Sequence, residues 1–229
     1  APEDHADGKY EQGYVYVFDR DPASQQWQRT ARFTASDGGE FDNFGAEGPQ
    51  DRYGGTVLAL SGDTALVGLP ETGPTPGGQA YVFERNAGGA NQWAEVARLT
   101  ASEVTAGSLF GLSVAIDGNV ALVGSPASDA AGFNAGAVYL FERNAGGPGR
   151  WGEVRLLTAS HAASTDWFGA SVALAGDTAV VAAPVVDLGA NTNQGRVYLL
   201  QRDQGGLGVR GEVRQFAVAA GQSDQELGA

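Results

Sequence analysis

Apolar residues in the middle of the chain fall into short runs separated by turn-forming residues. Residues 112–116 (LSVAI) and 120–125 (VALVGS) are apolar, and an Asp-Gly dipeptide typical of tight hairpin turns follows the first run. A third run, 137–141 (AVYLF), follows a loop rich in Gly and Ala, and residues 151–158 (WGEVRLLT) alternate polar with apolar side chains. No window combines helical periodicity with capping residues. The pattern predicts four antiparallel strands and no helix.

The same succession of runs returns along the chain with a period of about 58 residues. Residues 109–126 (LFGLSVAIDGNVALVGSP) and 167–184 (WFGASVALAGDTAVVAAP) are the clearest copies, and 52–70 is a weaker one. Tandem units of four antiparallel strands are typical of β-propeller blades. We therefore predict an all-β fold with about three and a half blades. The expected division is 1–36 as the second half of a blade, 37–102, 103–160 and 161–216 as blades, and 217–229 as a tail leading toward a next blade.

The units resemble FG-GAP repeats, which form the propeller of integrin α subunits and occur in many secreted bacterial proteins. For the first motif, the matching residues are Phe110-Gly111, Phe168-Gly169 and Tyr53-Gly54. For the second motif they are Gly124-Ser125-Pro126, Ala182-Ala183-Pro184 and Gly68-Leu69-Pro70. The resemblance covers nearly the whole chain. It implies an extracellular or cell-surface protein that binds other proteins, as in cell adhesion, and that is not an enzyme.

Both ends of the sequence carry incomplete units. Residues 13–18 and 27–36 supply only strands three and four of a first unit, and residues 226–229 (ELGA) match the segment that precedes a first strand. An outer strand pair without inner strands leaves an unpaired apolar edge. We expect strands from outside the sequence to complete the half-blade 13–34. They would come from a longer polypeptide or from a protein partner, including a second copy in a homo-oligomer or filament. A distorted four-blade ring is the remaining alternative.

Composition narrows the possible functions. The chain has 27 acidic and 14 basic residues and a net charge of −13, which argues against binding nucleic acid or an anionic membrane surface. It has no Cys, so disulfides, thiolate metal sites and cysteine nucleophiles are excluded. Its apolar runs are too short to insert across a bilayer.

Acidic residues gather in the loops that join strand two to three and strand four to one. Antiparallel order places these loops on one face, which we call the loop face. We predict that the loop face binds a protein partner or a cation; the alternative is that these loops are simply polar and variable. The candidate contact residues are Asp4, Asp7, Phe41, Asp42, Phe44, Asp51, Asp129, Trp167 and Asp187.

Metal binding and catalysis find less support in the sequence. Many FG-GAP repeats carry calcium ligands in a long loop between strands one and two, but here 61–64, 117–119 and 176–179 are short and offer one or two side-chain oxygens each. Calcium takes 6–8 oxygen ligands. We therefore expect no cofactor, with Asp129 and Asp187 as weak candidates for a shared cation. No acid–base pair or nucleophile is recognisable. Besides a binding module, the alternatives are a structural subunit of a surface layer or filament joined by strand addition, and an accessory domain of a larger secreted enzyme.

Overall fold

The computed structural model describes residues 8–10, 12–40, 42, 44–45, 57–70, 77–204, 210–217 and 223–228. The predicted contact residues Asp4, Asp7, Phe41 and Asp51 lie outside them, as does Tyr53-Gly54. The described residues form 14 strands and no helix, so none of them forms a helix that could cross a membrane. The all-β prediction is confirmed.

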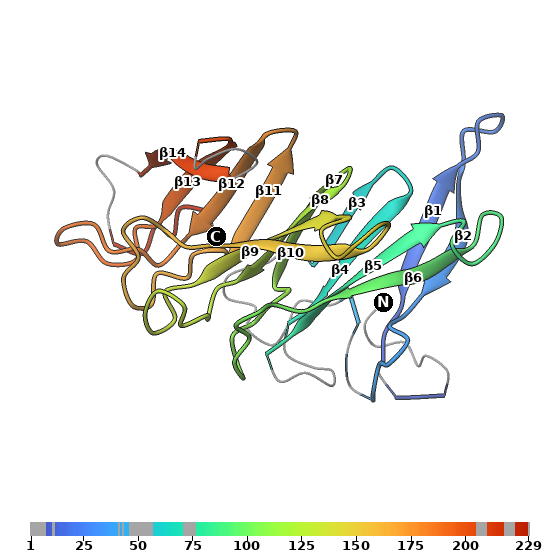
Figure 1. Cartoon of the computed structure of the whole chain (residues 1–229), viewed down its shortest axis with the longest axis horizontal. Coiled ribbons are helices and arrows are strands. Elements are labelled where there is room, and N and C mark those ends of the chain that lie inside the picture. Colours follow the sequence, from blue (N-terminus) through green and yellow to red (C-terminus); the bar gives the residue numbers. More distant parts are fainter. Residues whose placement is uncertain are drawn as a thin grey trace.

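The strands form three four-stranded sheets and one two-stranded sheet, all antiparallel (Figure 1). The half-blade is β1 (Val15–Arg20) and β2 (Trp27–Phe33). Blade one is β3 (Leu58–Ser61), β4 (Thr64–Leu69), β5 (Gln79–Arg85) and β6 (Trp93–Leu99). Blade two is β7 (Ser113–Asp117), β8 (Val120–Ser125), β9 (Ala137–Arg143) and β10 (Trp151–Leu157). Blade three is β11 (Ser171–Ala175), β12 (Thr178–Ala183), β13 (Arg196–Arg202) and β14 (Arg210–Phe216).

The four sheets stand side by side in chain order, with the half-blade at one end and blade three at the other (Figure 1). Neighbouring sheets touch most closely through their first strands, β3 with β7 and β7 with β11. The first two strands of each blade are joined by two-residue turns in which Gly62, Gly118 and Gly176 have positive φ, as tight hairpins require. The register between strands three and four shifts in all four sheets, which marks a recurring irregularity or bulge in the outer pair.

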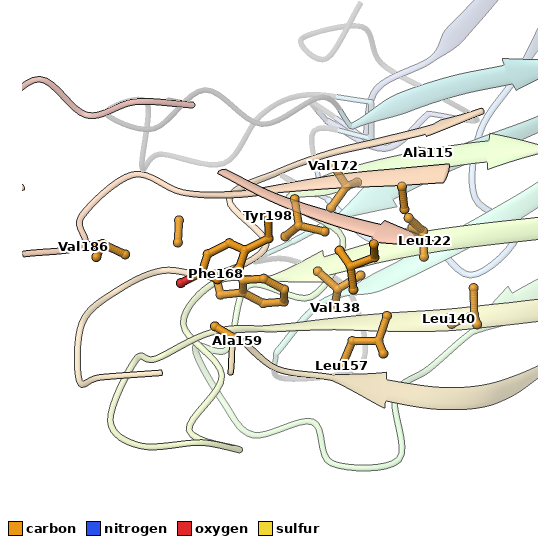
Figure 2. Packing of buried hydrophobic residues seen from close by; sticks show 14 residues of the cluster. Ala115, Leu122, Val138, Leu140, Leu157, Ala159, Phe168, Val172, Val186 and Tyr198 are labelled. Atoms are coloured by element: carbon orange, nitrogen blue, oxygen red, sulfur yellow. The ribbon is translucent and has the colours of Figure 1, made fainter. Parts of the chain in front are cut away.

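The hydrophobic core lies between the sheets and is built from alternate side chains of each strand. We call the face of a unit that meets the preceding unit its leading face, and the opposite one its trailing face. Between blades two and three, Leu122, Val138 and Leu140 from the trailing face pack against Phe168 and Tyr198 (Figure 2). Equivalent clusters join the half-blade to blade one and blade one to blade two. Each blade is therefore stabilised by its neighbours.

The phenylalanine of the first FG motif is Phe44, which corrects two sequence predictions. Phe44 is fully buried and meets Tyr81 edge-on at 5.6 Å, as Phe110 meets Tyr139 at 5.4 Å. Its N–H donates to the carbonyl of Gln12 at 2.8 Å, matching the bond from Phe110 to the preceding unit. The motif therefore lies at Phe44-Gly45 rather than at Tyr53-Gly54. Phe44 is a core residue and not a contact residue on the surface.

Candidate interaction site

A groove of about 230 Å³ lies beside the half-blade, where the other units have their inner strands. One wall is β1, with Val15 and Val17, and the other is formed by β3 and β4 of blade one. Leu58 and Leu60 lie on the β3 side of the groove. The lining is almost entirely apolar, which is unusual for a surface that faces water.

Comparison between blades shows what normally covers such a surface. Leu58 and Leu60 are 43% and 65% exposed, whereas their equivalents in blade two, Val114 and Ile116, are 2% and 7% exposed. Val114 and Ile116 are covered by the inner hairpin of the preceding blade, where Leu66 is fully buried and Ala59 packs against the same cluster. The groove is thus the place that an inner hairpin occupies in the other units.

The groove also presents an unpaired strand edge. β1 pairs only with β2 among the described residues, whereas its equivalents β5, β9 and β13 each pair on both sides. In blade one, β4 pairs with β5 over six residues, from Thr64–Glu84 to Leu69–Gln79. An edge strand next to an apolar surface is a template for an added strand, because main-chain hydrogen bonds and apolar pockets act together.

The loop face is assembled as the antiparallel order predicts. The N–H groups of Thr165, Trp167 and Phe168 donate to carbonyls of residues 133–135 in the preceding unit, at 2.8, 3.3 and 3.0 Å. The same three bonds recur at the end of the chain, where residues 224–227 bind residues 192–194 at 2.9, 3.0 and 3.1 Å. The segment before residue 229 therefore lies on blade three as an FG segment lies on blade two.

Asp129 and Asp187 are exposed residues at equivalent places on this face, and each organises its own loop. A carboxylate oxygen of Asp129 accepts the N–H of Asn134 at 2.8 Å, and one of Asp187 accepts the N–H of Asn193 at 2.9 Å. Both asparagines have positive φ, which Asn tolerates better than most residues. Within the described residues, no group of three or more His, Asp or Glu side chains is arranged to hold a metal ion.

Asp42 and Asp166 occupy equivalent positions two residues before the motif phenylalanines. Each is buried and accepts an N–H from the residue three positions earlier, Gly39 or Ala163. Asp42 is thus a turn-forming residue in this structure rather than an exposed contact. Trp167 is half-buried with a φ of 61°, next to Phe168.

A second hollow, of about 250 Å³, opens on the loop face of blade three. His161, Asp166, Asp187 and Arg196 line it. Burial raises the pKa of Asp166, and the nearby Asp187 acts in the same direction, while the Ala163 N–H and Arg196 oppose the rise. The hollow mixes acidic and basic groups, so it has no single charge preference.

Replacing Asp166 with Asn should increase stability at neutral pH. A raised carboxyl pKa means that the folded state holds its proton more tightly than the unfolded state, so stability decreases as pH rises through that pKa. Asn removes the buried charge and keeps an oxygen to accept the Ala163 N–H. Thermal unfolding should be measured between pH 7 and pH 4. At pH 7 the variant should have a higher Tm than the parent chain, and this difference in Tm should become smaller as the pH is lowered. Asp129→Asn, an exposed carboxylate in an equivalent unit, is the control; a constant difference across pH would contradict the prediction.

Two recurring polar contacts join the outer strands of successive units, and neither follows from the sequence alone. In the first, the Ser after strand four donates its N–H to a Glu on strand four of the next unit. The pairs are Ser36–Glu95 (2.9 Å), Ser102–Glu153 (2.8 Å) and Ser160–Glu212 (3.3 Å). In the second, an Arg that ends strand three pairs with an acidic residue of the preceding strand three. The pairs are Arg85–Asp19 (2.8 Å) and Arg143–Glu84 (2.5 Å).

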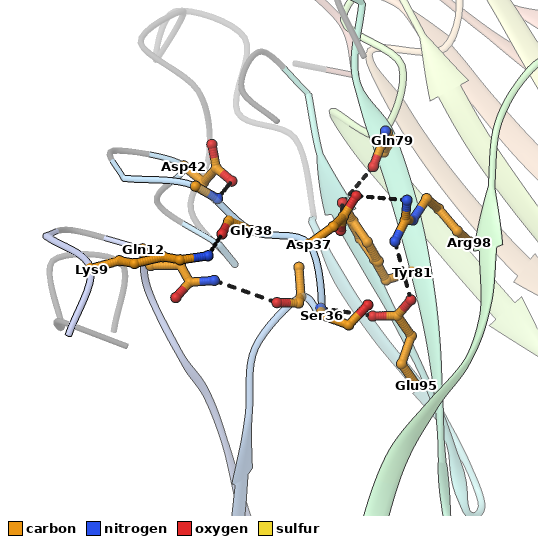
Figure 3. Close-up of polar contacts among 12 residues, drawn as sticks. Lys9, Gln12, Ser36, Asp37, Gly38, Asp42, Gln79, Tyr81, Glu95 and Arg98 are labelled. Atoms are coloured by element: carbon orange, nitrogen blue, oxygen red, sulfur yellow. Dashed lines mark hydrogen bonds and ion pairs between the residues drawn. The ribbon is translucent and has the colours of Figure 1, made fainter. Parts of the chain in front are cut away.

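Around Ser36 the first contact grows into a network that holds the half-blade against blade one (Figure 3). Asp37 pairs with Arg98 at 2.6 Å and accepts a hydrogen bond from the Tyr81 hydroxyl at 3.1 Å. Arg98 also lies 3.7 Å from Glu95. Burial, and then the charge of Asp37, raise the pKa of Tyr81, so this phenol stays protonated. Asp37 is therefore partly neutralised and adds less negative charge to the loop face than its position in the sequence indicates.

Stacked sheets of four antiparallel strands, with their loops gathered on one face, define a protein of the β-propeller type. The family described as FG-GAP repeat matches residues 93–141 and 151–200. Each match runs from the fourth strand of one blade to the third strand of the next. These two stretches are therefore similar to FG-GAP repeats, as the resemblance predicts. A comparison with curated proteins found no match.

Proposed function

We propose that the chain is a non-enzymatic binding and assembly module that acts outside the cell, and that its main contact site is the groove beside β1. The occupant is a β-hairpin of the same kind as β3–β4, β7–β8 and β11–β12. The observation that carries this proposal is the contrast between Leu60, which is 65% exposed, and Ile116, its covered equivalent at 7%. Burying such side chains is worth roughly 1.5–3 kcal/mol each.

The hairpins of the chain itself indicate the side chains that the occupant needs. Between blades, one residue from strand one and one from strand two cover the next unit, Ala59 with Leu66 and Ala115 with Leu122. An occupant therefore carries a small residue on its first strand and a Leu or similar residue on its second. That second strand pairs with the open edge of β1.

The match to the FG-GAP repeat and the loop face support the remaining parts of the proposal. FG-GAP repeats are typical of extracellular binding proteins. The exposed carboxylates of Asp129 and Asp187 make the loop face a second surface, suited to a positively charged partner. A filament or surface-layer subunit joined by strand addition would use the same groove, whereas an accessory domain would have it filled by its own polypeptide.

Binding of a synthetic hairpin tests the groove directly. The probe is the sequence of residues 113–125, closed by a disulfide between added terminal cysteines so that the hairpin is preorganised. We expect saturable binding by fluorescence anisotropy and protection of β1 amides from hydrogen exchange. Leu60→Glu should weaken binding at least tenfold, which corresponds to about 1.4 kcal/mol.

The matched control is Val154→Glu, since Val154 is also an exposed apolar strand residue but lies on β10, away from the groove. It should bind the hairpin as the parent chain does. Equal binding by both variants, or no binding of the hairpin at millimolar concentration, would exclude the groove as the contact site.

A further inference from the structure

The leading face of the half-blade is an exposed aromatic surface that the other units keep covered. It carries Tyr16, Phe18 and Trp27, the equivalents of Tyr139, Phe141 and Trp151 in blade two. Phe18 and Trp27 are 54% and 68% exposed, against 2% and 8% for Phe141 and Trp151. The difference arises because blade one covers the leading face of blade two, whereas no described unit precedes the half-blade.

The trailing face of blade three is exposed in a complementary way. It carries Val180, Val197, Leu199 and Phe216, which correspond by register to Leu122, Val138, Leu140 and Leu157 of blade two. Phe216 is 44% exposed, whereas Leu157 is 6% exposed and packs in the core between blades two and three. Aliphatic and aromatic side chains of one trailing face thus lie open at one end of the array.

These two surfaces are the two halves of one kind of interface. Inside the chain, a trailing face meets an aromatic leading face three times, at the junctions of the half-blade with blade one, blade one with blade two, and blade two with blade three. The two open faces lie at opposite ends of the array (Figure 1). A second copy placed in line with the first would bring these two faces together in the way that the internal junctions do.

The last described segment completes this match. Residues 224–227 are bound to loops of blade three as an FG segment, with Leu227-Gly228 in the place of Phe168-Gly169. At each internal junction, the FG segment lies between the preceding blade and the unit to which it belongs. At a junction between copies, residues 223–228 of one copy would take this place in front of the half-blade of the next.

We propose that copies of the chain associate head to tail, with the trailing face of blade three on the leading face of the half-blade. This inference extends the assembly role in the proposed function to a further surface, which adjoins the groove along β1, where Tyr16 and Phe18 border both. The contact joins two different surfaces, so it generates open chains of copies or a closed ring rather than a dimer in which both copies use the same surface.

Differences at the outer rim make this junction weaker than the internal ones. Gln201 stands where Asp19 and Glu84 pair with an Arg of the next unit. Arg29 stands where the other units have Glu95, Glu153 and Glu212. Both recurring polar contacts are therefore lost between copies, and the apolar faces must carry the association. We expect reversible assembly that increases with concentration.

Two single variants and their mixture provide the test, by sedimentation velocity over a concentration series. The parent chain should form oligomers, either a series of increasing size or a single closed ring. Trp27→Glu disables the leading face and Phe216→Glu the trailing face, so each variant alone should be monomeric, with a dissociation constant raised at least tenfold. Mixed one to one, they should form a dimer and nothing larger, because each contributes one intact face. Val154→Glu should assemble as the parent does.

Dimer formation in the mixture would also show that both variants are folded, because unfolded variants would not pair with each other. A monomeric parent chain at its highest soluble concentration, oligomers of either single variant, or a mixture without dimer would each overturn the proposal. Hairpin binding, measured on the same variants, separates the two surfaces. If the chain binds the hairpin but does not assemble, only the head-to-tail contact is rejected. If it assembles but does not bind the hairpin, only the groove is rejected as a contact site.

Discussion

Replacing Phe168 with Ala should lower the free energy of unfolding by about 3–5 kcal/mol, the usual loss when a buried Phe is truncated. Phe168 is buried between blades two and three, where its ring meets Tyr198 edge-on at 5.1 Å (Figure 2). The cavity would open at the junction between blades two and three, so the substitution would mainly weaken the packing of one blade against the other. For a chain of this length, we expect Tm to decrease by roughly 6–20 °C.

The matched control is Phe133→Ala, because Phe133 is 65% exposed on a loop of the same blade junction. Surface substitutions of this kind usually change stability by less than about 0.5 kcal/mol. Urea unfolding of both variants provides the comparison. Similar midpoints for the two variants would mean that the FG phenylalanine does not hold the junction.

The same measurement on Phe44→Ala tests the corrected position of the first motif. Phe44 packs against Tyr81 and Phe83, so its loss should match that of Phe110→Ala. Tyr53→Ala is the comparison that the sequence pattern suggests. A larger loss for Tyr53→Ala than for Phe44→Ala would restore the first motif to Tyr53-Gly54.

The strands and blades can be predicted from the sequence because two independent patterns agree. Alternation and turn residues give the four strands of a unit, and repetition shows that the unit recurs. The sequence pattern does not point to Phe44-Gly45, because the number of residues between the Phe-Gly motif and the first strand varies between blades. Only Leu112 separates Gly111 from β7, whereas residues 46–57 separate Gly45 from β3. Fixed spacing therefore favoured Tyr53-Gly54, although Phe44-Gly45 is the better match in residue type.

The contacts between units depend on neighbours that the sequence does not place. Recurrence of Glu95, Glu153 and Glu212 is visible in the sequence, but their partners lie 51 to 59 residues away. The same is true of the loop carboxylates. Sequence spacing does not reveal that Asp129 and Asp187 accept hydrogen bonds from N–H groups within their own loops. In both cases the residue type was informative, and the partner required the fold.

The two-stranded half-blade was predicted from the sequence. The half-blade and the unpaired edge of β1 follow from the strand count, and the structure adds the groove beside them. The recurrence of Trp27, Trp93 and Trp151 indicates packing between blades. Only in the structure is Trp27 seen to be uncovered, because its covering unit is not among the described residues. This difference gives the leading face its place in the proposed assembly.

Replacing Gly124 with Ala should also be strongly destabilising, for a steric reason that recurs between blades. A methyl group at Gly124 would lie 2.1 Å from the carbonyl oxygen of Gly169 and 2.2 Å from the hydroxyl oxygen of Ser113. The Ser113 hydroxyl donates to that same carbonyl at 2.7 Å. The FG turn of blade three would therefore have to move and lose this bond. Overpacking of this kind usually costs about 1–3 kcal/mol, and the lost bond adds roughly 1 kcal/mol.

Blade three provides the control for this substitution, because Ala182 occupies the place of Gly124 there. The segment that passes Ala182 is residues 227–228, and it accommodates the methyl group. Ala182→Gly should therefore change stability by only about 1 kcal/mol, the ordinary difference between Gly and Ala in a strand. Thermal unfolding should separate the two variants by several degrees. If Gly124→Ala were as stable as the parent chain, blades two and three could not be packed as closely as Gly124 and Gly169 require.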